Sequence, residues 1–217
     1  ESYAATYLKE EIQQEALAQG IEGFSRFLFV VAAESGKFLD LTKLASQAQI
    51  PRHSAIRYFE ILEDTLIIRR CDAFRKSLRK RLMQAPRFFF FDTGVLNGLL
   101  GNFTVSADRI GPLFEQFIFN QIIHSAASKD MKIRVSSYRT EHGAEVDFIL
   151  EIGSKIFGIE VKSQSSISGL DLRGIKSFQE YAGKKNKCFI VYPGTISKKV
   201  EGVEITPWTV FLKNMGL

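Results

Sequence analysis

The residues best suited to chemistry lie in one stretch, Ala144–Lys162, where two alternating segments flank Gly153-Ser154. This pattern predicts two antiparallel strands joined by a two-residue turn. In that register Asp147 lies directly opposite Glu160, with Lys162 two residues along the same face. Opposed carboxylates repel each other, and a divalent cation would reverse that interaction, because Mg²⁺ binds one or two carboxylates together with water and phosphate oxygens. The stretch therefore favours a divalent-cation site.

The same register sorts the hairpin into two faces. One face is apolar and is expected to pack on the core: Val146, Phe148, Leu150, Ile152, Phe157, Ile159 and Val161. The other face carries the charged residues together with Ile149, Ile156 and Gly158. The alternative to a cation site is an ordinary solvent-facing strand on which Glu145 pairs with Lys162.

A third carboxylate precedes the hairpin, on a helix predicted over about 112–126. At about 100° per residue, Glu115 falls in the middle of the apolar face, whereas Gln116 and Asn120 fall on the polar side. Burying a lone carboxylate is costly unless it is paired or bound to a metal. We therefore expect Glu115 to join the acids of the hairpin.

These residues resemble the PD-(D/E)XK restriction-endonuclease-like pattern: a helix Glu115, a strand Asp147 and the sequence Glu160-Val161-Lys162 on the next strand. The proline of the pattern is replaced here by valine. The resemblance implies a metal-dependent DNA endonuclease that hydrolyses phosphodiesters with Mg²⁺ or Mn²⁺. It assigns Asp147, Glu160 and the Val161 carbonyl as metal ligands. Glu115 is assigned as an additional acid or a water-mediated ligand, and Lys162 as the group that activates or orients the attacking water.

A basic run lies ahead of this region. Residues 69–87 contain eight basic residues and one acid, whereas the whole chain carries a formal charge of +5. Such a concentration is typical of proteins with a nucleic-acid partner. We expect contacts with nucleic acid, DNA in the first place, from basic residues of the run and of the helix before it: Arg52, Arg57, Arg69, Arg70, Lys76, Arg79, Lys80 and Arg81.

The elements around the basic run predict a winged helix-turn-helix. A helix over 41–47 with Asp40 as its N-cap is followed by a tight turn and a second helix over about 51–63. Strands over 66–68 and 87–91 then flank the run. The alternative is a winged helix that contacts proteins.

Nearly the whole chain resembles the C-terminal region of a prokaryotic, archaeal-type AAA+ ATPase family. The resemblance rests on GPLFEQFI (111–118), YRTEHGAEVDFIL (138–150), IEVKS (159–163) and LRGIKSF (172–178). It implies an N-terminal ATPase domain that binds ATP, a linker helix over 1–20, a winged-helix domain over 21–95 and a nuclease-like domain over 96–217. The fold class is thus α/β, α+β overall, with a restriction-endonuclease-like mixed β-sheet flanked by helices.

Composition narrows the class of protein. With 45% hydrophobic and 24% charged residues the chain is globular, and no apolar stretch reaches the roughly 20 residues of a membrane span. Two cysteines without C-x-x-C spacing favour a reducing cytoplasm. No phosphate-binding G-x-x-x-x-G-K-[S/T] loop occurs, so we expect no ATPase activity in this chain itself. A start at Glu1 without Met or a leader suggests part of a longer, cytoplasmic protein, and an oligomer is compatible with the sequence.

Two functional hypotheses remain. The first is a DNA nuclease guided by the winged helix. The second is a non-catalytic module that recognises DNA or protein and regulates the ATPase, with the acidic cluster kept for structural reasons.

Overall fold

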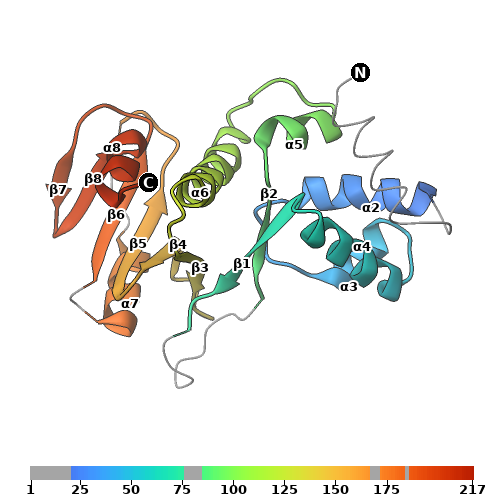
Figure 1. Ribbon diagram of the computed structural model, residues 1–217, viewed down its shortest axis with the longest axis horizontal. Helices are drawn as coiled ribbons and strands as arrows, with labels where there is room; N and C mark the ends of the chain where they lie inside the picture. Colours follow the sequence, from blue (N-terminus) through green and yellow to red (C-terminus); the bar gives the residue numbers. More distant parts are fainter. Residues whose placement is uncertain (1–20, 76–84, 167–171, 184–185) are drawn as a thin grey trace. The chain divides into compact units, whose positions relative to one another are not determined.

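The computed structural model describes residues 21–75, 85–166, 172–183 and 186–217 (Figure 1). The linker helix expected over 1–20 and four of the basic residues, Lys76, Arg79, Lys80 and Arg81, lie outside these ranges. The described residues form seven helices and eight strands, a mixed α/β chain. They divide into two compact units, one made of residues up to 70 with 87–106 and the other of 71–86 with 107–217. None of the helices described has the length and apolarity that a bilayer crossing requires.

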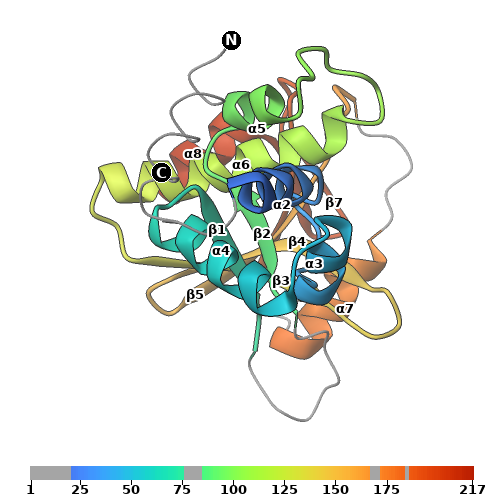
Figure 2. The same cartoon turned by 90° about the vertical axis from the view of Figure 1, so that its right-hand side faces the viewer.

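The first unit combines helices with a pair of strands. Its elements are α2 (Ile21–Ala33), α3 (Leu41–Gln47), α4 (Arg52–Asp64), the start of β1 (Ile68–Ala73), β2 (Arg87–Phe90) and α5 (Thr93–Leu99). The helices α2, α3 and α4 lie side by side in both views (Figure 1 and Figure 2). Large aromatic side chains fill the space between helices and strands; Phe59 of α4 meets Phe88 of β2 edge-on, with 5.4 Å between ring centroids.

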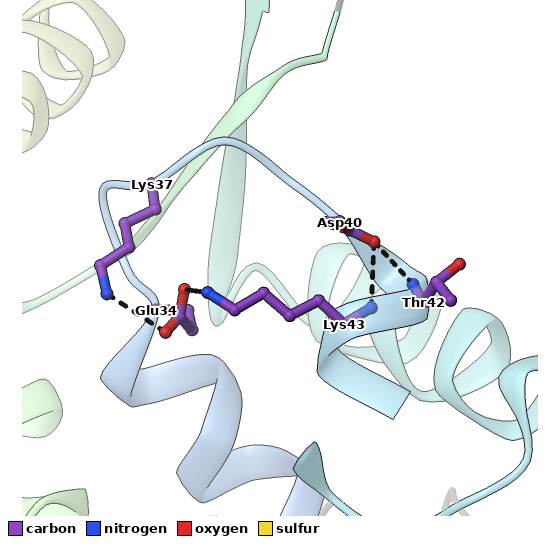
Figure 3. A network of polar contacts seen from close by, with 5 residues as sticks. All are labelled: Glu34, Lys37, Asp40, Thr42 and Lys43. Atoms are coloured by element: carbon purple, nitrogen blue, oxygen red, sulfur yellow. Dashed lines mark hydrogen bonds and ion pairs between the residues drawn. The ribbon is translucent and has the colours of Figure 1, made fainter. Parts of the chain in front are cut away.

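A polar network joins the end of α2 to the start of α3 (Figure 3). Glu34 accepts hydrogen bonds from Lys37 Nζ (3.1 Å) and Lys43 Nζ (2.9 Å). Asp40 Oδ1 accepts the backbone N–H groups of Thr42 and Lys43, both at 3.0 Å, so the predicted N-cap and the bounds of this helix are confirmed. Burial raises the pKa of the Glu34 carboxyl, but the bonds from Lys43 and Lys37 outweigh burial and hold the pKa below its ordinary value.

The strand predicted over 66–68 is wrong in its extent. It begins at Ile68 and continues to Ala73, so Arg69 and Arg70 belong to a strand and not to a loop. The returning strand over Arg87–Phe90 agrees with the prediction, and all four of its residues are buried. Sequence reasoning missed α5, whose N-cap Asp92 accepts the backbone N–H of Val95.

The second unit is a mixed sheet with helices on both faces. Its elements are the end of β1, α6 (Ile110–Ser128), β3 (Ile133–Arg139), β4 (Glu145–Ile152), β5 (Lys155–Val161), α7 (Arg173–Ala182), β6 (Lys187–Tyr192), β7 (Lys198–Val200), β8 (Val203–Pro207) and α8 (Trp208–Met215). The strands follow the order β1-β3-β4-β5-β6-β8-β7. The pairs β1–β3, β5–β6 and β6–β8 are parallel, and β3–β4, β4–β5 and β7–β8 are antiparallel.

The two faces are covered by different helices. Gly158 lies so close to α7 that a Cβ there would be 3.0 Å from Phe178 Cδ1 and from Cys188 Sγ. The next residue of β6, Phe189, points to the opposite face and packs on Phe211 of α8, with 5.3 Å between ring centroids. On that second face, Phe119 of α6 also packs on Phe148, at 5.6 Å. The alternative considered in the sequence, an ordinary solvent-facing strand, is therefore wrong, because α7 covers that face of the hairpin.

A β-bulge interrupts the alternation of β4. The register of β3 on β4 shifts between two pairs, Ser136↔Ile149 and Tyr138↔Val146. One residue of β3 therefore lies opposite two residues of β4, Asp147 and Phe148, as in a β-bulge. Strict alternation would separate Val146 from Ile149, yet both join the apolar cluster under α7. The predicted grouping of Val146 with Phe148 is wrong for this reason.

We predict that Glu34→Gln lowers stability at pH 7 by up to about 1 kcal/mol, since both lysines are half exposed. The pKa of the Glu34 carboxyl is lower in the folded protein than in the unfolded chain. Its contribution to the free energy of unfolding is therefore present above the unfolded pKa of about 4.3 and is lost as the pH falls through the folded pKa. Urea unfolding at pH 7 and pH 3 measures the difference. Glu22→Gln, on a side chain that is 94% exposed, serves as control; a Glu34→Gln deficit of the same size at both pH values would contradict the account.

Candidate functional site

The predicted acids lie where β4 and β5 separate. The antiparallel pairing of these strands runs from Ile152↔Lys155 to Phe148↔Ile159, which confirms the predicted register. Asp147 and Glu160 are the next residues on each strand. Beyond this point β4 continues along β3 to Glu145, and β5 continues along β6 to Val161. We call this divergence the fork.

Asp147 bridges the fork through its side chain. Its Oδ2 atom accepts the backbone N–H of Val161 at 2.7 Å. Val161 is the residue directly after Glu160, so the bond holds the Asp147 carboxylate against β5 beside the second acid. The bulge contributes to this placement, since bulges commonly re-aim a side chain next to a functional site.

Glu160 is mostly buried and is bound by Lys162. Lys162 Nζ donates to Glu160 Oε1 at 2.7 Å, and only 18% of the Glu160 side chain is exposed. Burial, the largest effect, raises the pKa of the Glu160 carboxyl above its ordinary value; Lys162 opposes the shift, and the charges of Glu145 and Glu115 add to it. Ionised Glu160 is therefore disfavoured at the fork by burial and by the neighbouring acids, and a nearby cation reduces this free-energy cost.

Glu115 lies near enough to Glu160 to act on its charge, as predicted, and its Oε1 atom is buried. The rest of α6 differs from the predicted amphipathic helix. Gln116 and Asn120, assigned to the polar side, are only 2% and 5% exposed. The helix is therefore covered on more than its apolar side, which explains why its hydrophobic pattern is weak.

A cavity of about 260 Å³ adjoins the fork. It is lined by the turn before β4 (142–144) and Glu145 at the start of that strand, by Glu160 and Lys162 at the end of β5, and by Arg173 and Gly174 at the start of α7. Sequence reasoning did not assign His142, Glu145, Arg173 or Gly174 to the site. They lie in the segments 138–150 and 172–178 that carry the family resemblance, but their meeting at one cavity depends on the tertiary packing of α7.

Glu145 has a different partner from the one considered in the sequence. Arg139 Nη1 lies 3.4 Å from Glu145 Oε2, while Lys162 pairs with Glu160. These two pairs replace the cross-strand pair Glu145–Lys162. Each carboxylate that lines the cavity is therefore accompanied by a basic side chain from the protein itself.

The donor set fits Mg²⁺ by chemical type. In the described part of the chain, no group of three or more His, Cys, Asp or Glu side chains is placed to hold a metal ion. The predicted set is smaller, with two carboxylates and the Val161 carbonyl, and Mg²⁺ takes one or two carboxylates with water and phosphate oxygens. Asp147 and Glu160, on adjacent strands at the fork, meet that requirement.

The predicted nucleic-acid contacts fall into two groups in the first unit. Arg52 and Arg57 are exposed on α4, and Arg52 Nε donates to Thr42 Oγ1 at 3.3 Å. Arg70 instead pairs with Glu63 at 3.2 Å and lies over the Phe59 ring, while the Nε atom of Arg69 is buried. The two arginines of α4 are thus the better placed for an external partner.

Comparison with known proteins finds matches to two domains of unknown function. Residues 110–211 match the sequence model of a domain of unknown function, DUF4143, and residues 1–106 match that of another, DUF8612. DUF4143 domains are typically found at the C-terminus of AAA-ATPase-type proteins.

The relatives found are uncharacterized. Uncharacterized proteins of Mycobacterium bovis and Mycobacterium tuberculosis are each 25% identical over 172 residues, 77% of this chain and 38% of theirs. The chain therefore spans well under half the length of these relatives. A crystal structure of a Vibrio cholerae protein aligns over 95% of this chain and 52% of its own, with 13% identity and a TM-score of 0.34.

We predict that Gly174→Ala destabilises the second unit by about 1–3 kcal/mol or more. A Cβ at this position would overlap the backbone carbonyl oxygen of Glu145, so α7 would have to move away from β4. Thermal unfolding followed by the Trp208 fluorescence measures the effect. Gly111→Ala in α6 is the control, since its Cβ would meet Ser163 Oγ at an ordinary 3.8 Å; equal melting temperatures for the two variants would refute the proposed close packing.

Proposed function

We propose that the fork is the catalytic site of a Mg²⁺- or Mn²⁺-dependent nuclease that hydrolyses phosphodiester bonds, carried as the C-terminal part of an ATPase. One observation supports this most: where β4 and β5 separate, Asp147 accepts the N–H of Val161, the residue between Glu160 and Lys162, and these last two pair with each other and line a cavity. The DUF4143 match, typical of the C-termini of AAA-ATPase-type proteins, is compatible with such a module.

Each residue has a distinct role in this proposal. Asp147 and Glu160, with the Val161 carbonyl, would hold the cation, which when bound polarises the phosphate and lowers the pKa of a water. Lys162 would orient the attacking water and offset negative charge as it develops on the phosphate. Glu115, through its charge next to Glu160, would help to keep the cation in place.

The first unit would bring the nucleic acid to this site as a winged helix-turn-helix. Support comes from α3 and α4, which are joined by the short segment 48–51 and followed by β1 and β2. Arg52 and Arg57 are exposed on α4, where they would neutralise backbone phosphates. We propose DNA as the nucleic acid that the first unit binds.

A non-catalytic module is the second candidate, and one observation favours it. Lys162 already donates to Glu160 at 2.7 Å, so a protein cation occupies a position beside the acid that a metal ion would need. In this case the acids stabilise the fork, and the chain recognises DNA or protein for the ATPase. Cleavage measurements separate the two candidates.

For catalysis, we predict that Asp147→Asn and Lys162→Gln each lower cleavage at least about 100-fold with Mg²⁺ or Mn²⁺. The asparagine keeps an oxygen that accepts the Val161 N–H, so the fork should stay folded. Single- and double-stranded DNA and RNA are the substrates, with EDTA as blank and Lys155→Gln, exposed at the hairpin turn, as control. Two results would favour the second candidate: cleavage by the wild type that persists in EDTA, or cleavage by both variants at the wild-type rate.

For binding, we predict that the double variant Arg52→Gln/Arg57→Gln weakens DNA binding and reduces the slope of log K against log salt by roughly 2. Each arginine that no longer neutralises a phosphate lowers the number of counterions released on binding by about one. Fluorescence anisotropy at several salt concentrations gives the slope. The matched control is Lys132→Gln/Lys213→Gln, two exposed lysines of the second unit; an unchanged slope in the α4 variant would assign α4 to protein contacts.

A further inference from the structure

We propose that Lys162 and a divalent cation bind Glu160 alternately: the ammonium group competes with the cation for this carboxylate and turns into the adjoining cavity when the cation binds. In this way Lys162 sets the cation affinity of the fork. The inference rests on the proposed function and deepens it, because it describes how the proposed metal site is regulated. Its basis is the hydrogen bond of 2.7 Å from Lys162 Nζ to Glu160 Oε1.

The position of the Lys162 ammonium group brings it into competition with any cation that uses Glu160. The group is bonded to one of the two carboxylate oxygens, and only 18% of the Glu160 side chain is exposed, so little of the carboxylate is left open. Two cations on one half-buried carboxylate also repel each other, and this repulsion is stronger than it would be in water. Binding of a divalent cation therefore favours release of the ammonium group.

The charges around the fork leave negative charge for a divalent cation. Besides Glu160, three carboxylates act on this region: Asp147, Glu115 and Glu145. Besides Lys162, the basic side chains are those of Arg139, which pairs with Glu145 at 3.4 Å, and of Arg173 and His142, which line the cavity. A divalent cation supplies two positive charges to these acids where the ammonium group supplies one. The exchange at Glu160 thus strengthens the Coulombic attraction at the fork.

Lys162 can leave Glu160 by a movement of its side chain alone. Its backbone N–H donates to the Val191 carbonyl at 2.9 Å, which holds the main chain against β6. The Lys162 side chain is 38% exposed, against 18% for Glu160, and it lines the cavity of about 260 Å³. A lysine has a flexible four-carbon stem, so the lysine is the partner that moves. Release from Glu160 also frees its ammonium group to orient the attacking water, the role given to it above.

The first test measures the affinity of the full chain for Mn²⁺ without nucleic acid, by electron paramagnetic resonance of free Mn²⁺. We expect Lys162→Met to bind Mn²⁺ about tenfold more tightly or better, because it removes a hydrogen bond to a charged group that the cation must otherwise break. Arg139→Gln is the matched control, since it removes one positive charge from the region but leaves the bond to Glu160 in place. Its affinity for Mn²⁺ should change less than about threefold.

The second test locates the ammonium group directly. Crystal structures of the wild type with and without Mn²⁺, with the ion placed by its anomalous scattering, give the distance from Lys162 Nζ to Glu160 Oε1. We expect the bond of 2.7 Å without Mn²⁺ and a released Lys162 that points into the cavity with Mn²⁺. A lysine that stays bonded to Glu160 beside bound Mn²⁺ overturns the alternation.

The outcomes separate this inference from the nuclease. Tighter binding of Mn²⁺ by Lys162→Met supports the alternation even if the wild type binds no Mn²⁺ or cleaves no nucleic acid, in which case only the nuclease proposal fails. Equal affinities of Lys162→Met and the wild type, no binding by either, or an equal gain in Arg139→Gln overturns the alternation. Cleavage that depends on Asp147 and on Mg²⁺ keeps the nuclease in each of these cases.

Discussion

The hydrogen bond from the Val161 N–H to Asp147 Oδ2 is the interaction on which the candidate site depends. It forms where the backbone pairing of β4 and β5 ends, so at this point the Asp147 side chain accepts the hydrogen bond of the Val161 N–H group. The bulge opposite Ser137 allows β4 to present this carboxylate while Val146 and Ile149 remain in the core under α7. Fold and site therefore share one local irregularity of the sheet.

The second constraint is electrostatic. Burial raises the pKa of the Glu160 carboxyl, and the charges of Glu145 and Glu115 act in the same direction against the bond from Lys162. Apolar residues at the half-buried position of Glu160 would often give a sheet of equal or greater stability. Three glutamates, Glu115, Glu145 and Glu160, lie close together there, and Glu145 and Glu160 each pair with a basic side chain. This arrangement supports the proposed chemistry, which needs positive charge nearby from a metal ion, a lysine or both.

Much of the local structure follows from the sequence. Strict alternation around Gly153-Ser154 fixes the pairing of β4 with β5, and the capping geometry of Asp40 fixes the start of α3, because both are short-range effects. The bulge at Asp147 and Phe148 depends on pairing with the neighbouring strand β3, so the alternation of residues within the hairpin does not predict it. The positions of Arg173 and Gly174 depend on tertiary packing of α7 against β4, and no spacing in the chain predicts it.

The central claim is that Asp147 and Glu160 together bind a divalent cation at the fork. Electron paramagnetic resonance of free Mn²⁺, titrated with wild type, Asp147→Asn and Glu160→Gln, tests it most directly. The account predicts saturable binding of Mn²⁺ by the wild type, competition by Mg²⁺, and loss of that binding in both variants. Wild-type protein that leaves the free Mn²⁺ signal unchanged, or variants that bind as the wild type does, would contradict it.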